Sequence, residues 1–137
     1  MYEKYMKMAL KQAKKALKRN EVPVGCVITK NNKIIAKAYN KKEKTKDVTK
    51  HAEIIAISKA CKKIKNWRLE NCEIYITMEP CMMCCGAIEQ SRIKKIIYGV
   101  KNENYGFTKN LKNIKIISHV YENECKKIVQ TFFKKRR

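Results

Sequence analysis

The most informative stretch of the sequence is EIYITMEPCMMC, residues 73–84. Residues 73–78 predict a strand that is cut by Pro80, residues 81–90 predict a short helix, and residues 94–100 predict another strand. A strand, a helix and a second strand in this order are typical of a right-handed parallel crossover. The stretch therefore indicates an α/β sheet covered by helices.

The remaining elements extend this pattern to both ends of the chain. Residues 2–19 place apolar side chains at spacings of three and four, with lysines on the other faces, which predicts an amphipathic helix. Further strands are expected at 22–28, 33–39 and 114–118, helices from His51 and over 121–137, a loop over 40–50, and a loop or ragged helix over 101–113. No linker or repeat interrupts the chain, so we expect one domain over residues 1–137.

The net charge favours a nucleic-acid partner. The chain has 33 Lys and Arg against 12 Asp and Glu, a formal charge of +21. Basic side chains that neutralise phosphates release counterions and so bind RNA or DNA. A second interpretation stays open, because 28 of the 33 basic residues are Lys. Such a bias also arises from base composition, and it would then be spread over solvated surface.

The sequence predicts a cytoplasmic protein with no membrane segment. No apolar run approaches the roughly 18 residues that a bilayer requires, and no apolar signal core follows Met1. The seven cysteines are an odd number, and only Cys81, Cys84 and Cys85 are closely spaced. This distribution favours a reducing compartment over a disulfide scaffold.

Two predicted helix starts carry the residues of a catalytic zinc site. Cys81 and Cys84 are three apart, so they lie on one helix face, and His51 opens the other helix. Two thiolates and one imidazole suit Zn²⁺, and three protein ligands leave a position for water. Zinc in such a site lowers the pKa of its bound water to about 7. Glu53 is placed to accept a proton from that water as general acid/base.

Each of these residues also has a simpler interpretation when it is taken alone. Cys81 and Cys84 are compatible with half of a four-cysteine zinc site or with a redox dithiol, and His51 with a helix cap. The other four cysteines form no second pair, and a dithiol gives no role to His51 and Glu53. The combined pattern, His-x-Glu followed by Pro-Cys-x-x-Cys, therefore favours a catalytic metal.

This combination is the signature of zinc-dependent nucleobase deaminases. The chain resembles, more narrowly, the bacterial tRNA-specific adenosine deaminase (TadA) family of the zinc-dependent cytidine/deoxycytidylate deaminase superfamily. The resemblance covers the chain up to about residue 100 and again the last helix. Its motifs are NEVPVG (20–25), Asn40, residues 47–53, NWRL (66–69), YITMEPCMMC (75–84), Gly86-Ala87, SRI (91–93) and Phe132-Phe133.

The resemblance implies a cytidine-deaminase-like, three-layer α/β/α sandwich with a central mixed sheet of about five strands. It implies hydrolytic conversion of adenosine to inosine at the wobble position of a tRNA, with water attacking C6 of adenine while Glu53 protonates N1. It also implies one zinc ion on His51, Cys81 and Cys84. Asn40 would lie in the base pocket, and the anticodon stem-loop would be bound by Asn102, Phe132, Phe133, Lys134, Arg136 and Arg137.

A homodimer is implied as well, with Met82, Met83 and Ala87 as candidates to bury against the partner. The sequence departs from the family pattern in a short segment 101–113, in Asn102 where Asp is usual, and in Lys134 where Arg is common. Two other functions remain possible at this stage. One is a small-molecule deaminase acting on cytosine, guanine or cytidine; the other is a zinc-stabilised RNA-binding module without turnover.

Overall fold

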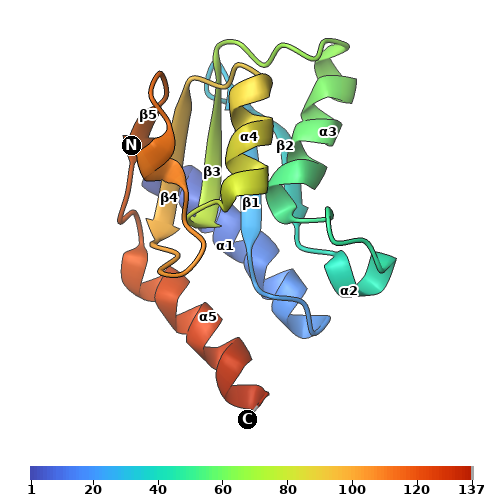
Figure 1. Ribbon diagram of the computed structural model, residues 1–137, viewed down its shortest axis with the longest axis vertical. Helices are drawn as coiled ribbons and strands as arrows, with labels where there is room; N and C mark the ends of the chain where they lie inside the picture. Colours follow the sequence, from blue (N-terminus) through green and yellow to red (C-terminus); the bar gives the residue numbers. More distant parts are fainter. Residues whose placement is uncertain (137) are drawn as a thin grey trace.

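A five-stranded mixed sheet forms the centre of the computed structural model, which describes residues 1–136 (Figure 1). The strand order is β2-β1-β3-β4-β5. The strands are β1 (Gly25–Lys30), β2 (Lys33–Tyr39), β3 (Cys72–Met78), β4 (Lys95–Val100) and β5 (Lys115–Ile117). The helices are α1 (Glu3–Lys18), α2 (Lys42–Thr45), α3 (Ala52–Ile64), α4 (Met82–Gln90) and α5 (Glu122–Lys135), with a 3-10 turn η1 (Thr108–Asn110).

The strand pairing confirms the predicted α/β class. β1 pairs antiparallel with both β2 and β3, whereas β3–β4 and β4–β5 are parallel pairs. The helix α4 connects β3 to β4, so the stretch over 73–100 forms the predicted parallel crossover. The carboxyl end of β3 consequently leads directly into the amino end of α4.

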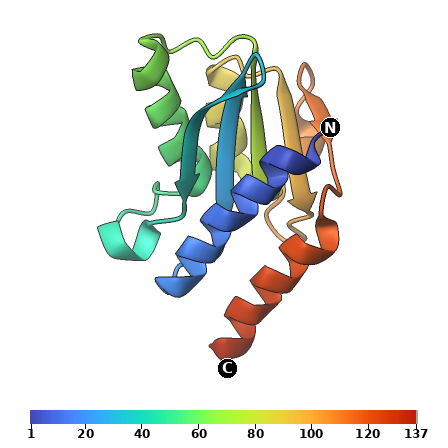
Figure 2. The same cartoon turned by 180° about the vertical axis from the view of Figure 1, so that it is seen from behind.

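Helices cover both faces of the sheet and complete the expected three layers. α3 and α4 lie on one face and α1 and α5 on the other, as the two opposite views show (Figures 1 and 2). Successive residues of β3 supply the two faces alternately, because side chains of a strand alternate in direction. Ile74 and Ile76 pack in the core under α3 and α4, while Tyr75 packs in the core under α1 and α5.

The first strand begins later than the sequence pattern predicts. β1 begins at Gly25, so Pro23 lies before the strand rather than at its start. Gly25 is also a point where the backbone of α1 approaches the sheet closely. A Cβ there would lie 1.9 Å from the backbone oxygen of Ala9, which no real side chain tolerates. Glycine is therefore required for α1 to pack against β1.

The segment 40–50 is not only a loop, because residues 42–45 form the short helix α2. The carboxylate of Glu21 accepts hydrogen bonds from the backbone N–H groups of Glu43 (3.0 Å) and Lys44 (2.9 Å), which stabilises its first turn. The cap comes from a residue more than 20 positions earlier, so the local composition does not reveal it. None of the helices between residues 1 and 136 is long and apolar enough to cross a membrane.

Candidate metal centre and substrate cavity

Two helix N-termini bring the predicted metal ligands together. His51 is the N-cap residue of α3 and Cys81 is the N-cap residue of α4, with Cys84 one turn into α4. The His51 Nδ1 atom lies 3.9 Å from the Cys81 sulfur and 3.5 Å from the Cys84 sulfur. The three donor atoms all lie within 4.8 Å of one another.

This donor set fits a tetrahedral zinc ion. Zn–S and Zn–N bonds of about 2.3 and 2.05 Å at tetrahedral angles place sulfur and nitrogen ligands about 3.6 Å apart. The two observed sulfur–nitrogen distances bracket this value. Cys85 does not join the group, since its buried thiol donates to the Pro80 carbonyl oxygen at 3.5 Å. His51, Cys81 and Cys84 would thus hold the metal and leave one position open.

The thiols of Cys81 and Cys84 affect each other's pKa. A hydrogen bond from Cys84 stabilises the Cys81 thiolate and lowers the pKa of Cys81 to about 3. The same bond stabilises the protonated form of Cys84, so its pKa is raised. The hydrogen bond to Cys81 also raises the pKa of His51 above its ordinary value. The lowered pKa of Cys81 favours the thiolate, which is the form that binds zinc.

Glu53 is a buried carboxyl group beside this cluster. Its side chain is only 4% exposed, and its Oε1 atom has no hydrogen-bond partner within the described chain. Burial raises the pKa of Glu53 to about 7. Both protonation states of this carboxyl group are therefore accessible at neutral pH. Buried polar atoms without a partner are rare, so the free oxygen marks a position where a ligand is expected.

A cavity of about 560 Å³ opens onto His51, Glu53 and Cys81. Its walls come from segments that are distant in sequence: the end of α1, the start of α2, the loop after β4, and the end of α5. The lining residues include Asn20, Glu21, Asn40, Lys42, Glu43, Met78, Glu79, Asn102, Tyr105, Phe132, Phe133 and Arg136. A volume of this size is typical of a small-molecule or nucleotide site.

Asn40 lines the cavity and also fixes the start of α3. Its Oδ1 atom accepts a hydrogen bond of 2.7 Å from the backbone N–H of Ala52. The loop that follows Asn40 is closed at its base, because the Lys41 N–H donates to the Lys50 carbonyl oxygen at 2.9 Å. These two hydrogen bonds fix Lys50 and Ala52, the residues directly before and after His51, and so fix the position of His51.

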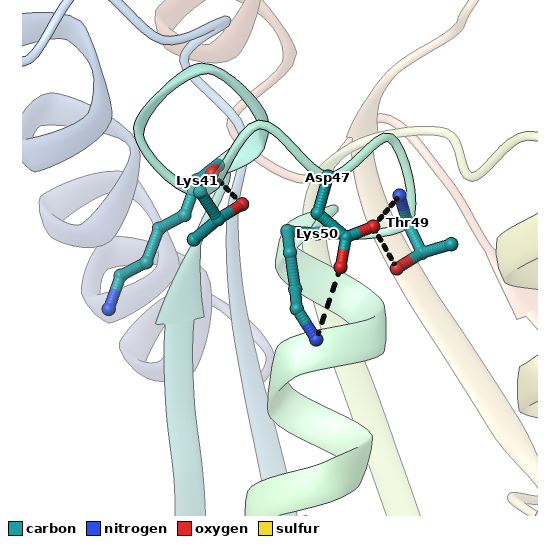
Figure 3. Close-up of polar contacts among 5 residues, drawn as sticks. Lys41, Asp47, Thr49 and Lys50 are labelled. Carbon is teal, nitrogen blue, oxygen red and sulfur yellow. Dashed lines mark hydrogen bonds and ion pairs between the residues drawn. The ribbon is translucent and has the colours of Figure 1, made fainter.

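Asp47 organises the last turn of this loop, as Figure 3 shows. One carboxylate oxygen accepts hydrogen bonds from the backbone N–H (2.9 Å) and the hydroxyl (2.6 Å) of Thr49. The other oxygen lies 3.8 Å from the Lys50 ammonium group. The hydrogen bonds from Thr49 lower the pKa of Asp47. The turn delivers the chain to His51 in an extended conformation, with φ −74° and ψ 154°.

The C-terminal helix brings some of the predicted RNA-contacting residues to the cavity. Phe132, Phe133 and Arg136 line it, and the Arg136 guanidinium lies 4.4 Å from the Phe132 ring centre. Arg136 also donates to the backbone oxygen of Asn20 at 2.9 Å, which joins the ends of α5 and α1. Lys134 is exposed and lies outside the cavity lining. The prediction for Arg137 lies outside the described residues.

Several cavity residues were not predicted from the sequence. Glu21 and Glu79 are buried carboxylates that hold loops at the cavity wall, and Tyr105 lines it directly. The one available signal was position, since Glu79 immediately precedes Pro80 and Cys81. Asn102 was predicted and does line the cavity.

Comparison with known proteins places this geometry in a family. The family model of the MafB19-like deaminases matches residues 2–137. The tRNA-specific adenosine deaminase of Buchnera aphidicola is 43% identical over 142 residues, covering 97% of this chain and 94% of that protein. A solved structure described in work on A-to-I editing by tRNA:A34 deaminases is 33% identical, with a TM-score of 0.85, covering 90% of this chain and 97% of that one.

A guanine deaminase from Bacillus subtilis is also similar. It is 36% identical with a TM-score of 0.72, but the match covers 76% of this chain and 67% of that chain. The predicted cytidine-deaminase-like fold and enzyme class are thus confirmed. By sequence over nearly its full length, this chain belongs to the family of tRNA-specific adenosine deaminases.

Proposed function

We propose that this chain, acting as a single deaminase domain over residues 1–137, converts adenosine to inosine at the wobble position of a tRNA. The observation that carries the proposal is the unpartnered Oε1 atom of Glu53 beside the His51, Cys81 and Cys84 donors. A structural metal site has no use for a buried carboxyl group with a free oxygen. The substrate is assigned from the relatives of this chain, because the proteins that it matches over nearly their full length are named tRNA-specific adenosine deaminases.

His51, Cys81 and Cys84 would hold one zinc ion, which when bound supplies the Lewis acid that activates water for attack on C6 of adenine. Glu53 accepts a proton from the water and delivers it to N1 of the base. The same carboxyl group then takes the second proton of the attacking water from the oxygen now bonded to C6 and carries it to the departing amine. Water and adenosine thus give inosine and ammonia. A pKa near 7 suits this exchange, because both protonation states of Glu53 are accessible.

Asn40 would orient the base in the cavity. Its carbonyl oxygen is bonded to the Ala52 N–H, so the amide NH₂ group is the donor that it offers to an acceptor nitrogen of the purine. Asn102 lines the same cavity and supplies a second amide. These side chains hold the base while Glu53 moves protons at N1 and at the amine.

The cavity wall favours RNA over a free nucleobase. Phe133 is 50% exposed, and Arg136, which also lines the cavity, adds a positive charge to its wall. Aromatic and cationic side chains at the edge of a site suit the bases and phosphates of a single-stranded loop. The +21 net charge adds attraction for the polyanion. Phe132 supports these residues from a buried position.

The alternative is a small-molecule deaminase, which the likeness to a guanine deaminase keeps open. The test supplies the zinc-loaded protein with an anticodon stem-loop that carries a wobble adenosine, and in parallel with free adenosine, cytidine and guanine. Inosine in the stem-loop with no turnover of the free compounds supports the proposal. Turnover of a free base with no inosine in the RNA would establish the alternative. Zinc is quantified in the same sample.

We also propose that the protein acts in the cytoplasm as a homodimer. The seven cysteines are all free, which suits a compartment that keeps thiols reduced. Met82 is 65% and Met83 37% exposed on α4, and with Ala87 they form a surface that a second copy would cover. Sedimentation of the protein at micromolar concentration tests this proposal. A monomer under these conditions would contradict it.

A further inference from the structure

Tyr105 combines high exposure with a place in the cavity wall. Its side chain is 72% exposed although it lines the cavity that contains His51 and Glu53. Between residues 1 and 136, no aromatic or cationic side chain stacks on its ring. The exposed Trp67 differs, because the guanidinium of Arg68 lies 4.4 Å from its ring centre. Tyr105 therefore presents an uncovered aromatic ring at the site.

The loop that carries Tyr105 is fixed by hydrogen bonds. The backbone N–H of Tyr105 donates to the Asn102 side-chain oxygen at 3.2 Å, and that of Gly106 donates to the Asn102 carbonyl at 2.9 Å. The buried carboxylate of Glu79 accepts from the backbone N–H groups of Asn102 and Thr108, both at 3.2 Å, and from the Thr108 hydroxyl at 2.5 Å. The ring thus projects from an ordered loop rather than a loose one.

The same loop is tied to the metal-binding segment. The Phe107 N–H donates to the Pro80 carbonyl oxygen at 3.1 Å, next to Cys81. Gly106 packs so closely that a Cβ there would lie 2.2 Å from Glu79 Oε1. Glu79 and Pro80 directly precede Cys81, so the position of Tyr105 is set relative to the catalytic centre.

We propose that Tyr105 is a stacking platform for a nucleobase next to the edited adenosine. The inference rests on the proposed function and adds a second base-binding position at the wall of the cavity. Bases of a single-stranded loop lose their stacking partners when one base is extruded, and an exposed aromatic ring replaces the lost partner. The platform accepts any base, because stacking does not read hydrogen-bonding edges. A free nucleobase substrate would gain nothing from this ring.

The test measures single-turnover deamination of the anticodon stem-loop by the wild type, Tyr105→Ala and Tyr105→Phe. Three substrates are used: the intact stem-loop, and two in which the nucleotide 5′ or 3′ of the wobble adenosine is abasic. Asn104→Ala is the matched control, because Asn104 is exposed on the same loop and lies outside the cavity lining. Thermal unfolding of each variant verifies that it folds. The unfolding temperature should change little, because both substituted side chains are exposed.

We expect Tyr105→Ala to lower kcat/KM on the intact stem-loop roughly 5- to 150-fold, the range for loss of one base–aromatic stack. Tyr105→Phe and Asn104→Ala stay within about twofold of wild type, as expected for retained stacking and for a surface change. Removal of one of the two bases that flank the wobble adenosine should lower the kcat/KM of the wild-type protein by a similar factor. It has no further effect on Tyr105→Ala, so the two changes are not additive.

Additive effects at both flanks, or wild-type activity of Tyr105→Ala, would overturn the stacking role while leaving the proposed function intact. A wild-type protein that forms no inosine in the intact stem-loop would overturn both. The intact substrate with the wild-type protein therefore separates failure of the proposed function from failure of this inference.

Discussion

The carboxylate of Glu79 accepts a hydrogen bond of 3.2 Å from the backbone N–H of Asn102. This bond joins the strand–helix turn before Cys81 to the loop after β4. The strands β3 and β4 are neighbours in the sheet and run parallel. The turn after β3 and the loop after β4 therefore lie at the same end of the sheet. Glu79 thus connects the segment of the candidate metal ligands to a wall of the cavity.

Glu79→Gln is expected to destabilise the protein by about 1–3 kcal/mol, because one carboxylate oxygen becomes an NH₂ group that faces N–H donors. Deamination of the stem-loop should fall while zinc content stays unchanged. Urea unfolding and zinc analysis are the measurements. Glu89→Gln, which removes the same charge from an exposed position on α4, is the control. Equal unfolding free energies for the two variants would contradict the role of Glu79.

Gly106→Ala is expected to disturb the same network by steric contact. The new methyl group would lie 2.2 Å from Glu79 Oε1 and 2.6 Å from the Asn102 carbonyl oxygen. Such overpacking costs about 1–3 kcal/mol. Glu79→Ala removes the carboxylate with which the new methyl group clashes. Gly106→Ala should therefore lower the free energy of unfolding by less in the Glu79→Ala protein than in the wild type. Full additivity in urea unfolding would show that the two residues act independently.

Glu53→Ala is expected to keep both zinc and fold while deamination falls at least about 100-fold, the smallest usual effect of losing a general acid/base. The fold should persist because the variant removes a buried carboxyl group whose Oε1 lacks a partner. Inosine formation, zinc content and thermal unfolding are measured together. Loss of zinc in this variant would show that Glu53 acts as a ligand instead.

Cys81→Ala is expected to lose most of the bound zinc, because it removes one of three protein donors. Cys85→Ala is the matched control: Cys85 is a buried neighbour whose thiol bonds to the Pro80 carbonyl oxygen outside the donor group. Its zinc content should equal that of the wild type. Metal analysis after gel filtration checks both variants, and wild-type zinc in Cys81→Ala would refute the ligand assignment.

Arg136→Ala is expected to weaken binding of the stem-loop and to reduce the slope of log affinity against log salt by about one unit. Arg136 lies at the cavity wall, whereas Lys14 lies on the exposed face of α1. Lys14→Ala removes a positive charge as well, and its slope should match that of the wild type. Equal slopes for all three proteins would show that Arg136 contacts no phosphate.

The fold class and the group of candidate metal donors were predictable because their signals are local. The strand over 73–78 and the helix over 81–90 follow from composition and from Pro80. The metal group follows from residue types whose chemistry is known, at spacings that place them on helix starts. The helix α2 was missed, since it depends on the distant carboxylate of Glu21.

The residue pattern alone thus indicated an α/β chain with a His and two Cys that suit a metal and a Glu close to them, because periodicity and donor chemistry are properties of short segments. The resemblance to a family connected these four residues with a deaminase. Only the tertiary structure brought His51 within 3.5 Å of the Cys84 sulfur and placed Glu79 under the loop of Tyr105. Such contacts join residues more than 20 positions apart. They form only when the packing of helices on both sheet faces fixes where each loop lies, which no local pattern specifies.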